Sequence, residues 1–271
     1  LYVKDLTDTL KTMYDKKMFK NLVFYMEACE AGSMFDGHLP TTQNTYAVTA
    51  TNPHQSSYAC DYNADYKAYL NDCWSRNYLN DTRWAMTNKK MDSRTHEEQY
   101  QWVKIQTTQS PECRYGNVDI AKFTLDQFQG QPSNDIPRQV PTTAGKIGTP
   151  QRDVPLRLLE RALEAENDYA TKRKLEADLE ALKLERYHHD LVWGAFARKM
   201  DIDISISQFD SNCNGIPVDS DCMKIGIEAA IEHCGEFDDY SFSYMWMINK
   251  ACQEGKIDKV PYALEEICGL F

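Results

Sequence analysis

Residues 22–33 constrain the fold more than any other part of this 271-residue chain. Residues 22–28 are apolar or aromatic apart from Glu27, and the run ends at Cys29, followed by small residues. Such a run is typical of a buried strand in a parallel α/β sheet. Ligands and reactive groups collect at the carboxyl edge of open α/β sheets. The sequence therefore predicts an α/β sheet that places Cys29 at that edge.

Cys29 has two interpretations. It can be a buried structural thiol, since free cysteine packs as a small hydrophobe. It can also be a nucleophile, because Glu27 and Glu30 flank it and two carboxylates beside a purely structural position would be poorly solvated. The Ala-Gly-Ser turn that follows offers backbone N–H groups to a developing oxyanion. We favour the nucleophile.

Further elements follow from spacing. Asp5 or Thr7 can cap a helix with Leu6, Leu10, Met13 and Tyr14 on one face. Residues 45–51 form an expected second strand that Asn52-Pro53 closes. Residues 93–108 predict a helix, and residues 116–128 a strand and a turn. Leucines at helical spacing predict a charged helix pair after the middle of the chain: Leu156, Leu159, Leu163, Leu175, Leu179 and Leu182.

Composition changes at residues 129–155, which hold five of the ten prolines and predict a mobile linker. The net charge is −1 for residues 1–155 and −10 for residues 156–271. No basic patch stands out, so nucleic acid is not an expected partner. No apolar run approaches 18 residues, so no membrane segment is expected. The expected domains are residues 1–128, a Pro-rich linker at 129–155, and a helical module at 156–271.

Nine cysteines are many for a reduced compartment, and no CxxC pair occurs. Disulfides are therefore expected, and neither a metal site nor a cofactor is. An odd count leaves at least one free thiol. Cys73 and Cys113 can pair with each other, Cys213 has no assigned partner, and Cys60 is expected to be structural. Asn80-Asp-Thr82 is a sequon for N-glycosylation.

Several motifs resemble the legumain family of asparaginyl endopeptidases. They are Tyr25-Met-Glu-Ala-Cys-Glu-Ala-Gly-Ser-Met34, His38-Leu-Pro40, Thr49-Ala-Thr-Asn-Pro53 and Ser56-Ser-Tyr-Ala-Cys60. The resemblance continues through Tyr69-Leu-Asn-Asp72, Tyr115-Gly-Asn117 and Gln127-Phe-Gln-Gly130, and weakly over the C-terminal part. The resemblance implies part of a caspase-like α/β sheet domain followed by a small, all-α, disulfide-stapled C-terminal prodomain. It also implies a cysteine endopeptidase that cleaves after Asn, and after Asp at acid pH.

The resemblance assigns roles to individual residues. Cys29 matches the nucleophile, and Glu27, Ser56 and Asp72 match the walls of the pocket for the substrate's Asn. Carboxylates can accept from the two N–H groups of an amide, so the residue types suit that substrate. For Asp72 alone, a loop cap is the other interpretation. The partner histidine and a pocket arginine of the family would precede Leu1, so this fragment is expected to be inactive alone.

The six histidines supply no clear substitute for that partner. His38 lies in the loop after the nucleophile, and His188-His189 lie on the charged helix. Two other functions stay open. One is a transamidase or peptide ligase of the same fold, which resolves the thioester with an amine. The other is a catalytically inactive homologue that binds without cleaving.

For the C-terminal part, the resemblance implies the disulfides Cys222–Cys252 and Cys234–Cys268. It implies processing at Asn167, although a surface position on a charged helix is the alternative. The prodomain would inhibit the protease within the same molecule until acid releases it. Expected partners are protein and peptide substrates and cystatin-type inhibitors. The expected location is a lysosomal, endolysosomal or vacuolar lumen, or outside the cell.

Overall fold

The computed structural model describes residues 2–130, 148–204, 213–215 and 217–270. The chain divides into two compact units. Unit 1 comprises Leu1–Gln151 with Asp210–Pro217, and unit 2 comprises Arg152–Phe209 with Val218–Phe271. The boundary falls inside the expected linker, most of which (131–147) lies outside the described residues. Unit 1 also includes a short segment from far down the chain, which spacing alone did not indicate.

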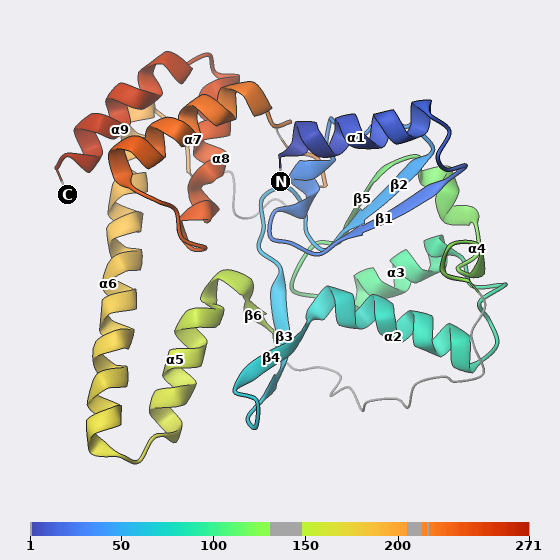
Figure 1. The fold of residues 1–271 in the computed structure, drawn as a ribbon, viewed down its shortest axis with the longest axis horizontal. Coiled ribbons are helices and arrows are strands. Elements are labelled where there is room, and N and C mark those ends of the chain that lie inside the picture. The colour runs from blue at the N-terminus through green and yellow to red at the C-terminus, as the bar shows by residue number, and fades with distance from the viewer. Residues whose placement is uncertain (1, 131–147, 205–212, 216, 271) are drawn as a thin grey trace. The chain divides into compact units, whose positions relative to one another are not determined.

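Unit 1 contains the expected α/β sheet, with strand order β1-β2-β5 (Figure 1). The pairing of β1 with β2 is parallel, as the apolar run predicted, and β5 is antiparallel to β2. All five residues of the central strand β2 are buried. The strands are β1 Leu22–Met26, β2 Thr45–Thr49 and β5 Cys113–Gly116.

Successive residues of β2 point to opposite faces of the sheet, and helices pack against both faces. Tyr46 and Val48 pack with Trp74 of α2 and Val103 of α3. Ala47 faces the other cluster, which contains Leu10 of α1. The elements are α1 Val3–Asp15, η1 Ala31–Met34, α2 Cys73–Thr87, α3 His96–Gln106, η2 Val118–Lys122 and α4 Asp126–Gln129.

Two sequence predictions about unit 1 were wrong in detail. The first helix begins at Val3, and no side chain caps it, so neither Asp5 nor Thr7 marks its start. Residues 116–128 form η2 and α4, while the strand precedes them in β5. The helix expected at 93–108 is α3, which begins at a capping box between Thr95 and Glu98.

A second small sheet projects from unit 1 with strand order β4-β3-β6. Its hairpin is followed directly by α2. Strand β6 comes from the end of the expected linker and pairs antiparallel with β3. The strands are β3 Tyr58–Asn63, β4 Ala68–Asp72 and β6 Thr149–Pro150.

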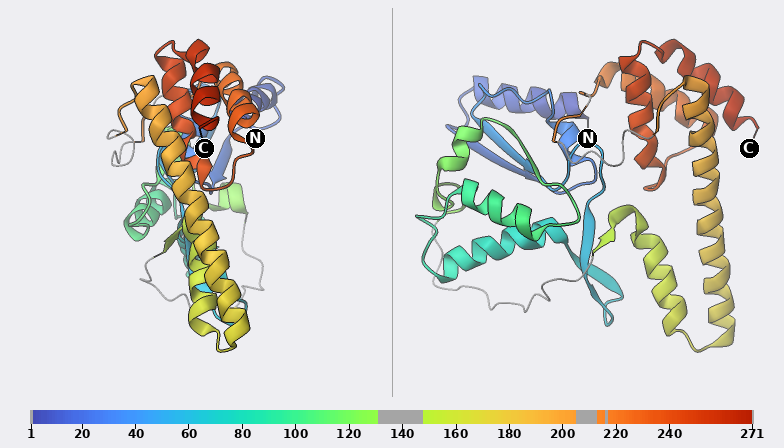
Figure 2. Two further views of the ribbon diagram at one scale, coloured as in Figure 1. Left: turned by 90° about the vertical axis from the view of Figure 1, so that its left-hand side faces the viewer. Right: turned by 180° about the vertical axis from the view of Figure 1, so that it is seen from behind.

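All regular secondary structure among the described residues of unit 2 is helical (Figure 2). The leucine pattern is explained by α5 and the 32-residue helix α6, which pack against each other. The last part of α6 enters a bundle through Val192, Trp193 and Phe196. The elements are η3 Gln151–Asp153, α5 Val154–Ala165, α6 Tyr169–Met200, α7 Ser220–Cys234, η4 Ser241–Tyr244, α8 Met245–Gln253, η5 Ile257–Lys259 and α9 Val260–Cys268.

Four disulfides account for eight cysteines. In unit 2, Cys222 pairs with Cys252 and Cys234 with Cys268, the interleaved arrangement that the resemblance implied. In unit 1 the pairs are Cys60–Cys73 and Cys113–Cys213. A Cys73–Cys113 pair is therefore wrong, because each cysteine has another partner at bonding distance. Cys29 is the free thiol.

Candidate active site

The loop that carries Cys29 leaves the carboxyl end of β1. Because β1 and β2 are parallel, the residues after β2 lie at the same edge of the sheet. Thr51, which is fully buried, follows β2 there. Its hydroxyl donates to the carbonyl of Ala28 and accepts from the N–H of Ala31, at 3.1 and 2.9 Å. One threonine therefore holds the backbone on both sides of Cys29.

The Cys29 thiol lies against two serine hydroxyls from the segment before β3. Its Sγ is 3.0 Å from Ser56 Oγ and 3.8 Å from Ser57 Oγ. The same segment is joined to the Cys29 loop by the N–H of Glu30, which donates to the Gln55 carbonyl at 2.8 Å. Cys29 is half-buried. This placement excludes a fully buried structural cysteine.

Glu27 is a half-buried residue two positions before Cys29. One carboxylate oxygen accepts from the backbone N–H and the hydroxyl of Ser75, at 3.0 and 2.8 Å. The other oxygen, Oε1, is buried and accepts no hydrogen bond of ordinary geometry among the described residues, although the Ser57 hydroxyl is near enough to lower the pKa of this carboxyl group. Burial raises the pKa of Glu27 to about 7, against the Ser75 hydrogen bond that lowers it, and the charge of Asp72 raises it further. A buried, unpaired acceptor is costly unless a ligand uses it.

Asp72 ends β4 and stands at the N-cap position of α2, but its side chain makes no cap hydrogen bond. The loop-cap interpretation is therefore wrong. Its carboxylate instead accepts from the side-chain amide of Gln151, which follows β6. Burial raises the pKa of Asp72, while the Gln151 hydrogen bond lowers it. A side-chain amide thus occupies one of the two carboxylates expected to bind an amide.

Most of the backbone N–H groups in the turn after Cys29 already donate to other acceptors, so fewer can bind an oxyanion than the sequence suggested. The N–H of Ala31 is used by Thr51, and the N–H of Ser33 donates to the Glu30 carbonyl at 2.9 Å. Glu30 itself adopts a left-handed conformation with φ of 51°. Two of the three N–H groups proposed for oxyanion binding therefore have other acceptors.

Other candidates lie away from this arrangement. Asn167 is in the turn between α5 and α6, where its N–H donates to Glu166 at 2.8 Å. Asn80 lies within α2 rather than on a loop, and its sequon partner Thr82 is buried and accepts from Gln99 at 2.9 Å. No histidine hydrogen-bonds to Cys29 in the part of the chain that the structure describes.

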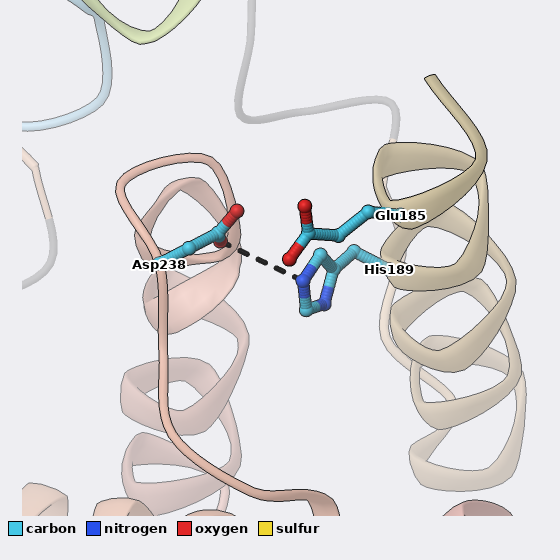
Figure 3. A group of neighbouring side chains, drawn as sticks. All are labelled: Glu185, His189 and Asp238. Atoms are coloured by element: carbon cyan, nitrogen blue, oxygen red, sulfur yellow. Dashed lines mark ion pairs between the residues drawn. The ribbon is translucent and has the colours of Figure 1, made fainter. Parts of the chain in front are cut away.

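One group of side chains has the spacing of metal ligands among the described residues. Glu185 and His189 lie one turn apart on α6, and Asp238 faces them from the loop before η4 (Figure 3). The imidazole Nε2 is 3.6 Å from the Asp238 carboxylate, which also accepts from the Ser241 N–H at 2.7 Å. Hydrogen bonding and ion pairing within unit 2 explain the cluster as an anchor for this loop.

The sequence reasoning missed four contributors: Thr51, Ser57, Ser75 and Gln151. Thr51 and Ser57 lie within two of the motifs that resemble the legumain family, so those motifs could have indicated both residues. Ser75 had none, because its contact to Glu27 spans 48 residues. Gln151 was assigned to the linker, and only the pairing of β6 with β3 brings it to Asp72.

The sequence of the chain is similar to those of known proteins. Residues 1–131 match the Peptidase C13 family. The chain is 32% identical to "Legumain" of Bos taurus, over 99% of this chain and 62% of that protein. It is 30% identical to "Hemoglobinase" of Schistosoma japonicum, over 99% of this chain and 63% of the other. "Vacuolar-processing enzyme" of Vicia sativa is 29% identical, over 94% and 56%.

The match to the Peptidase C13 family over residues 1–131 supports a cysteine peptidase class for this part of the chain. Over nearly its whole length the chain is similar to legumains. It spans 62% of the length of the bovine relative. No helix among the described residues is long and apolar enough to cross a membrane.

Proposed function

We propose that the whole protein is a cysteine endopeptidase that cleaves after Asn, and after Asp at acid pH, with Cys29 as its nucleophile. The observation that supports this most is the half-buried free thiol of Cys29 beside the buried, unpaired oxygen of Glu27. The thiol supplies the attacking group, and the carboxylate oxygen can accept from a substrate amide. The similarity to legumains supports the same activity.

The reaction begins with the Cys29 thiolate attacking the scissile carbonyl carbon, which gives a thioester as the amine leaves. Water then releases the acyl group. A general base must take the thiol proton, and among the described residues Cys29 hydrogen-bonds only to Ser56 and Ser57. The proposed base is a histidine outside residues 1–271, so this chain alone should not turn over substrate.

The pocket for the substrate's Asn is proposed between Glu27 and Asp72. The two carboxylates can accept both amide N–H groups, which an apolar side chain cannot replace without leaving buried acceptors unpaired. A substrate Asp becomes acceptable as pH falls for two reasons. Glu27, whose pKa burial raises to about 7, loses its charge first. The repulsion from Asp72 then ends when the substrate Asp is itself protonated. Its reference pKa of about 3.9 places that change in the acid range.

The test uses the whole protein, Cys29→Ala and Cys29→Ser, and peptides that differ only by Asn, Gln, Asp or Ala before the cleaved bond. We expect cleavage after Asn, loss of cleavage in both variants, and a rise in Asp cleavage as pH falls. Added amine nucleophiles separate the ligase alternative, because a ligase gives mainly joined peptides. Absence of any product from the intact protein would favour the inactive homologue.

Synthesis as an inactive precursor is the second part of the proposal. Strand β6 pairs with β3 as an extended peptide would, and Gln151 presents an amide to Asp72. Gln151 therefore resembles a bound substrate residue one methylene too long. The C-terminal module at 156–271 is proposed as the remainder of the inhibitory prodomain, and residues 129–155 as its connection to the peptidase domain at 1–128.

Acid is the proposed activator. The net charge of −10 over residues 156–271 falls in magnitude as carboxylates protonate, which weakens ion pairs that depend on them. Cleavage after Asn167 would then separate the precursor into two chains. Lysosomal, vacuolar or extracellular location, N-glycosylation at Asn80 and inhibition by cystatin-type proteins are proposals that the legumain similarity supports.

A further inference from the structure

A short strap, residues 213–215 and 217, is fixed to unit 1 although it lies between α6 and α7 of unit 2. Cys113 at the start of β5 is fully buried and forms a disulfide with Cys213, 100 residues later. The two sulfurs are 2.05 Å apart and the Cα atoms 5.4 Å apart, which is ordinary disulfide geometry. The strap is therefore covalently bound to the central sheet.

Noncovalent contacts hold the same strap. The hydroxyl of Tyr115 donates to the Cys213 carbonyl at 2.7 Å, and the N–H of Gly215 donates to the Asp36 carboxylate at 2.5 Å. Pro217 packs over Gly37 so closely that a Cβ there would lie 2.6 Å from its ring. The contacts come from β5 and from the loop after η1. The strap is thus seated on unit 1 rather than merely linked to it.

The chain order gives this strap a consequence. Unit 2 leaves unit 1 after Gln151 and returns to it at the strap, before α7 begins at Ser220. The α5–α6 turn with Asn167 lies between these two attachments. Cutting the peptide bond in this turn removes the first attachment only. The disulfide and the strap still connect α7, α8 and α9 to unit 1.

We propose that cleavage in the α5–α6 turn yields a two-chain protein in which Cys113–Cys213 retains the C-terminal module on unit 1. Acid alone then does not release the module. Release needs a second cut after Cys213, or a dithiol reductant. In that reduction the S–S bond breaks, the reductant forms its own disulfide, and two protons end on Cys113 and Cys213. The natural cut at Asn167 belongs to the proposed function, whereas the linkage does not depend on it.

The test uses the whole protein in a Cys29→Ala background, so that its own activity plays no part. A recognition sequence for a site-specific protease is inserted between Asn167 and Asp168, and the protein is digested with that protease. Thiols are alkylated before denaturing electrophoresis. We expect one species of undiminished mass without reductant and two after dithiothreitol. With Cys213→Ser, two species should appear without reductant.

The matched control is Cys222→Ser with Cys252→Ser, which removes a disulfide inside unit 2 and should leave the cut chains joined. Should Cys213→Ser fold poorly, peptide mapping of the unreduced wild type must still show Cys113 linked to Cys213. Separation of the cut wild-type chains without reductant, or alkylated Cys113 in the folded protein, would overturn the proposal. Failure of the proposed function would appear elsewhere, as an intact Cys29 protein that cleaves no Asn peptide.

Discussion

At the residue scale, the site depends on small hydroxyl side chains placed around one thiol. Thr51 holds the backbone on both sides of Cys29, Ser56 and Ser57 contact its sulfur, and Ser75 fixes Glu27. Each contact joins segments that are distant in sequence. The geometry of the Cys29 loop therefore depends on packing around it more than on the loop's own residues.

Thr51→Val should show this dependence. The change keeps the side-chain shape but removes two buried hydrogen bonds, which costs on the order of 1–3 kcal/mol of unfolding free energy. Peptide cleavage by the whole protein should fall more than substrate binding, because the loop loses its alignment. Thr51→Ser, which keeps the hydroxyl, is the control and should retain most activity. Equal loss in both variants, measured by chemical denaturation and by kcat and KM, would contradict the clamp.

Asp72→Asn tests the pocket at the same scale. An amide side chain has one acceptor oxygen and an NH₂ group that can only donate, so it pairs less well with the N–H groups of a substrate amide. Cleavage after Asn should therefore weaken by about 1–3 kcal/mol in kcat/KM. Cleavage after Asp should suffer less as pH falls. Unchanged kcat/KM for both substrates across the acid range would remove Asp72 from the pocket.

At the element scale, strand β6 illustrates what the sequence could and could not show. The spacing of apolar residues predicted β1, β2, α3 and the α5–α6 pair, because each of these patterns lies within one segment of the chain. The pairing of β6 with β3 depends on residues about 90 positions apart, and the proline content indicated a linker. Cys29, Glu27, Ser56 and Asp72 were found through motifs. Gln151 could not be found, since its role comes only from tertiary placement.

Gln151→Glu should weaken the seating of β6. The new carboxylate would face Asp72, whose pKa is already raised by burial, so the strand should leave β3 more readily near neutral pH. We expect faster activation of the precursor and higher labelling of Cys29 by a thiol-reactive Asn peptide at pH 7. Gln129→Glu adds the same charge at an exposed position of α4 and is the control. Identical labelling in the two variants would argue against self-blocking by β6.

At the scale of the whole molecule, buried titratable groups set the pH at which unit 1 is most stable. Burial raises the pKa of Glu27 to about 7 and that of Glu112 to about 8. Their stabilising protonated forms are fully present below the unfolded pKa of about 4.5 and are lost as pH rises through 7 and 8. Burial lowers the pKa of His96 to about 4, so its contribution falls as pH drops from 6.5 toward 4. The two carboxyl groups outweigh the single imidazole above pH 5.

Unit 1 should therefore unfold at a higher temperature at pH 5.5 than at pH 7.5. Glu112→Gln supplies a neutral side chain at every pH and keeps an acceptor for Trp74, whose indole N–H donates to Glu112 at 2.8 Å. Its melting temperature should depend less on pH, and its stability at pH 7.5 should rise. Asp92→Asn, at an exposed position, is the control. A wild-type melting temperature that rises steadily from pH 5.5 to 7.5 would contradict this assignment.

The single unpaired thiol also affects how the protein is made. Eight cysteines must find four partners while Cys29 stays reduced, and nine cysteines allow roughly 945 such arrangements, nine times the 105 for eight. A free thiolate can attack any newly formed disulfide and exchange it. Hydrogen bonds from Thr51, Ser56 and Ser57 hold the Cys29 loop in place once β1 has entered the sheet. Early formation of the β1–β2 pair would then guard the correct connectivity during oxidative folding.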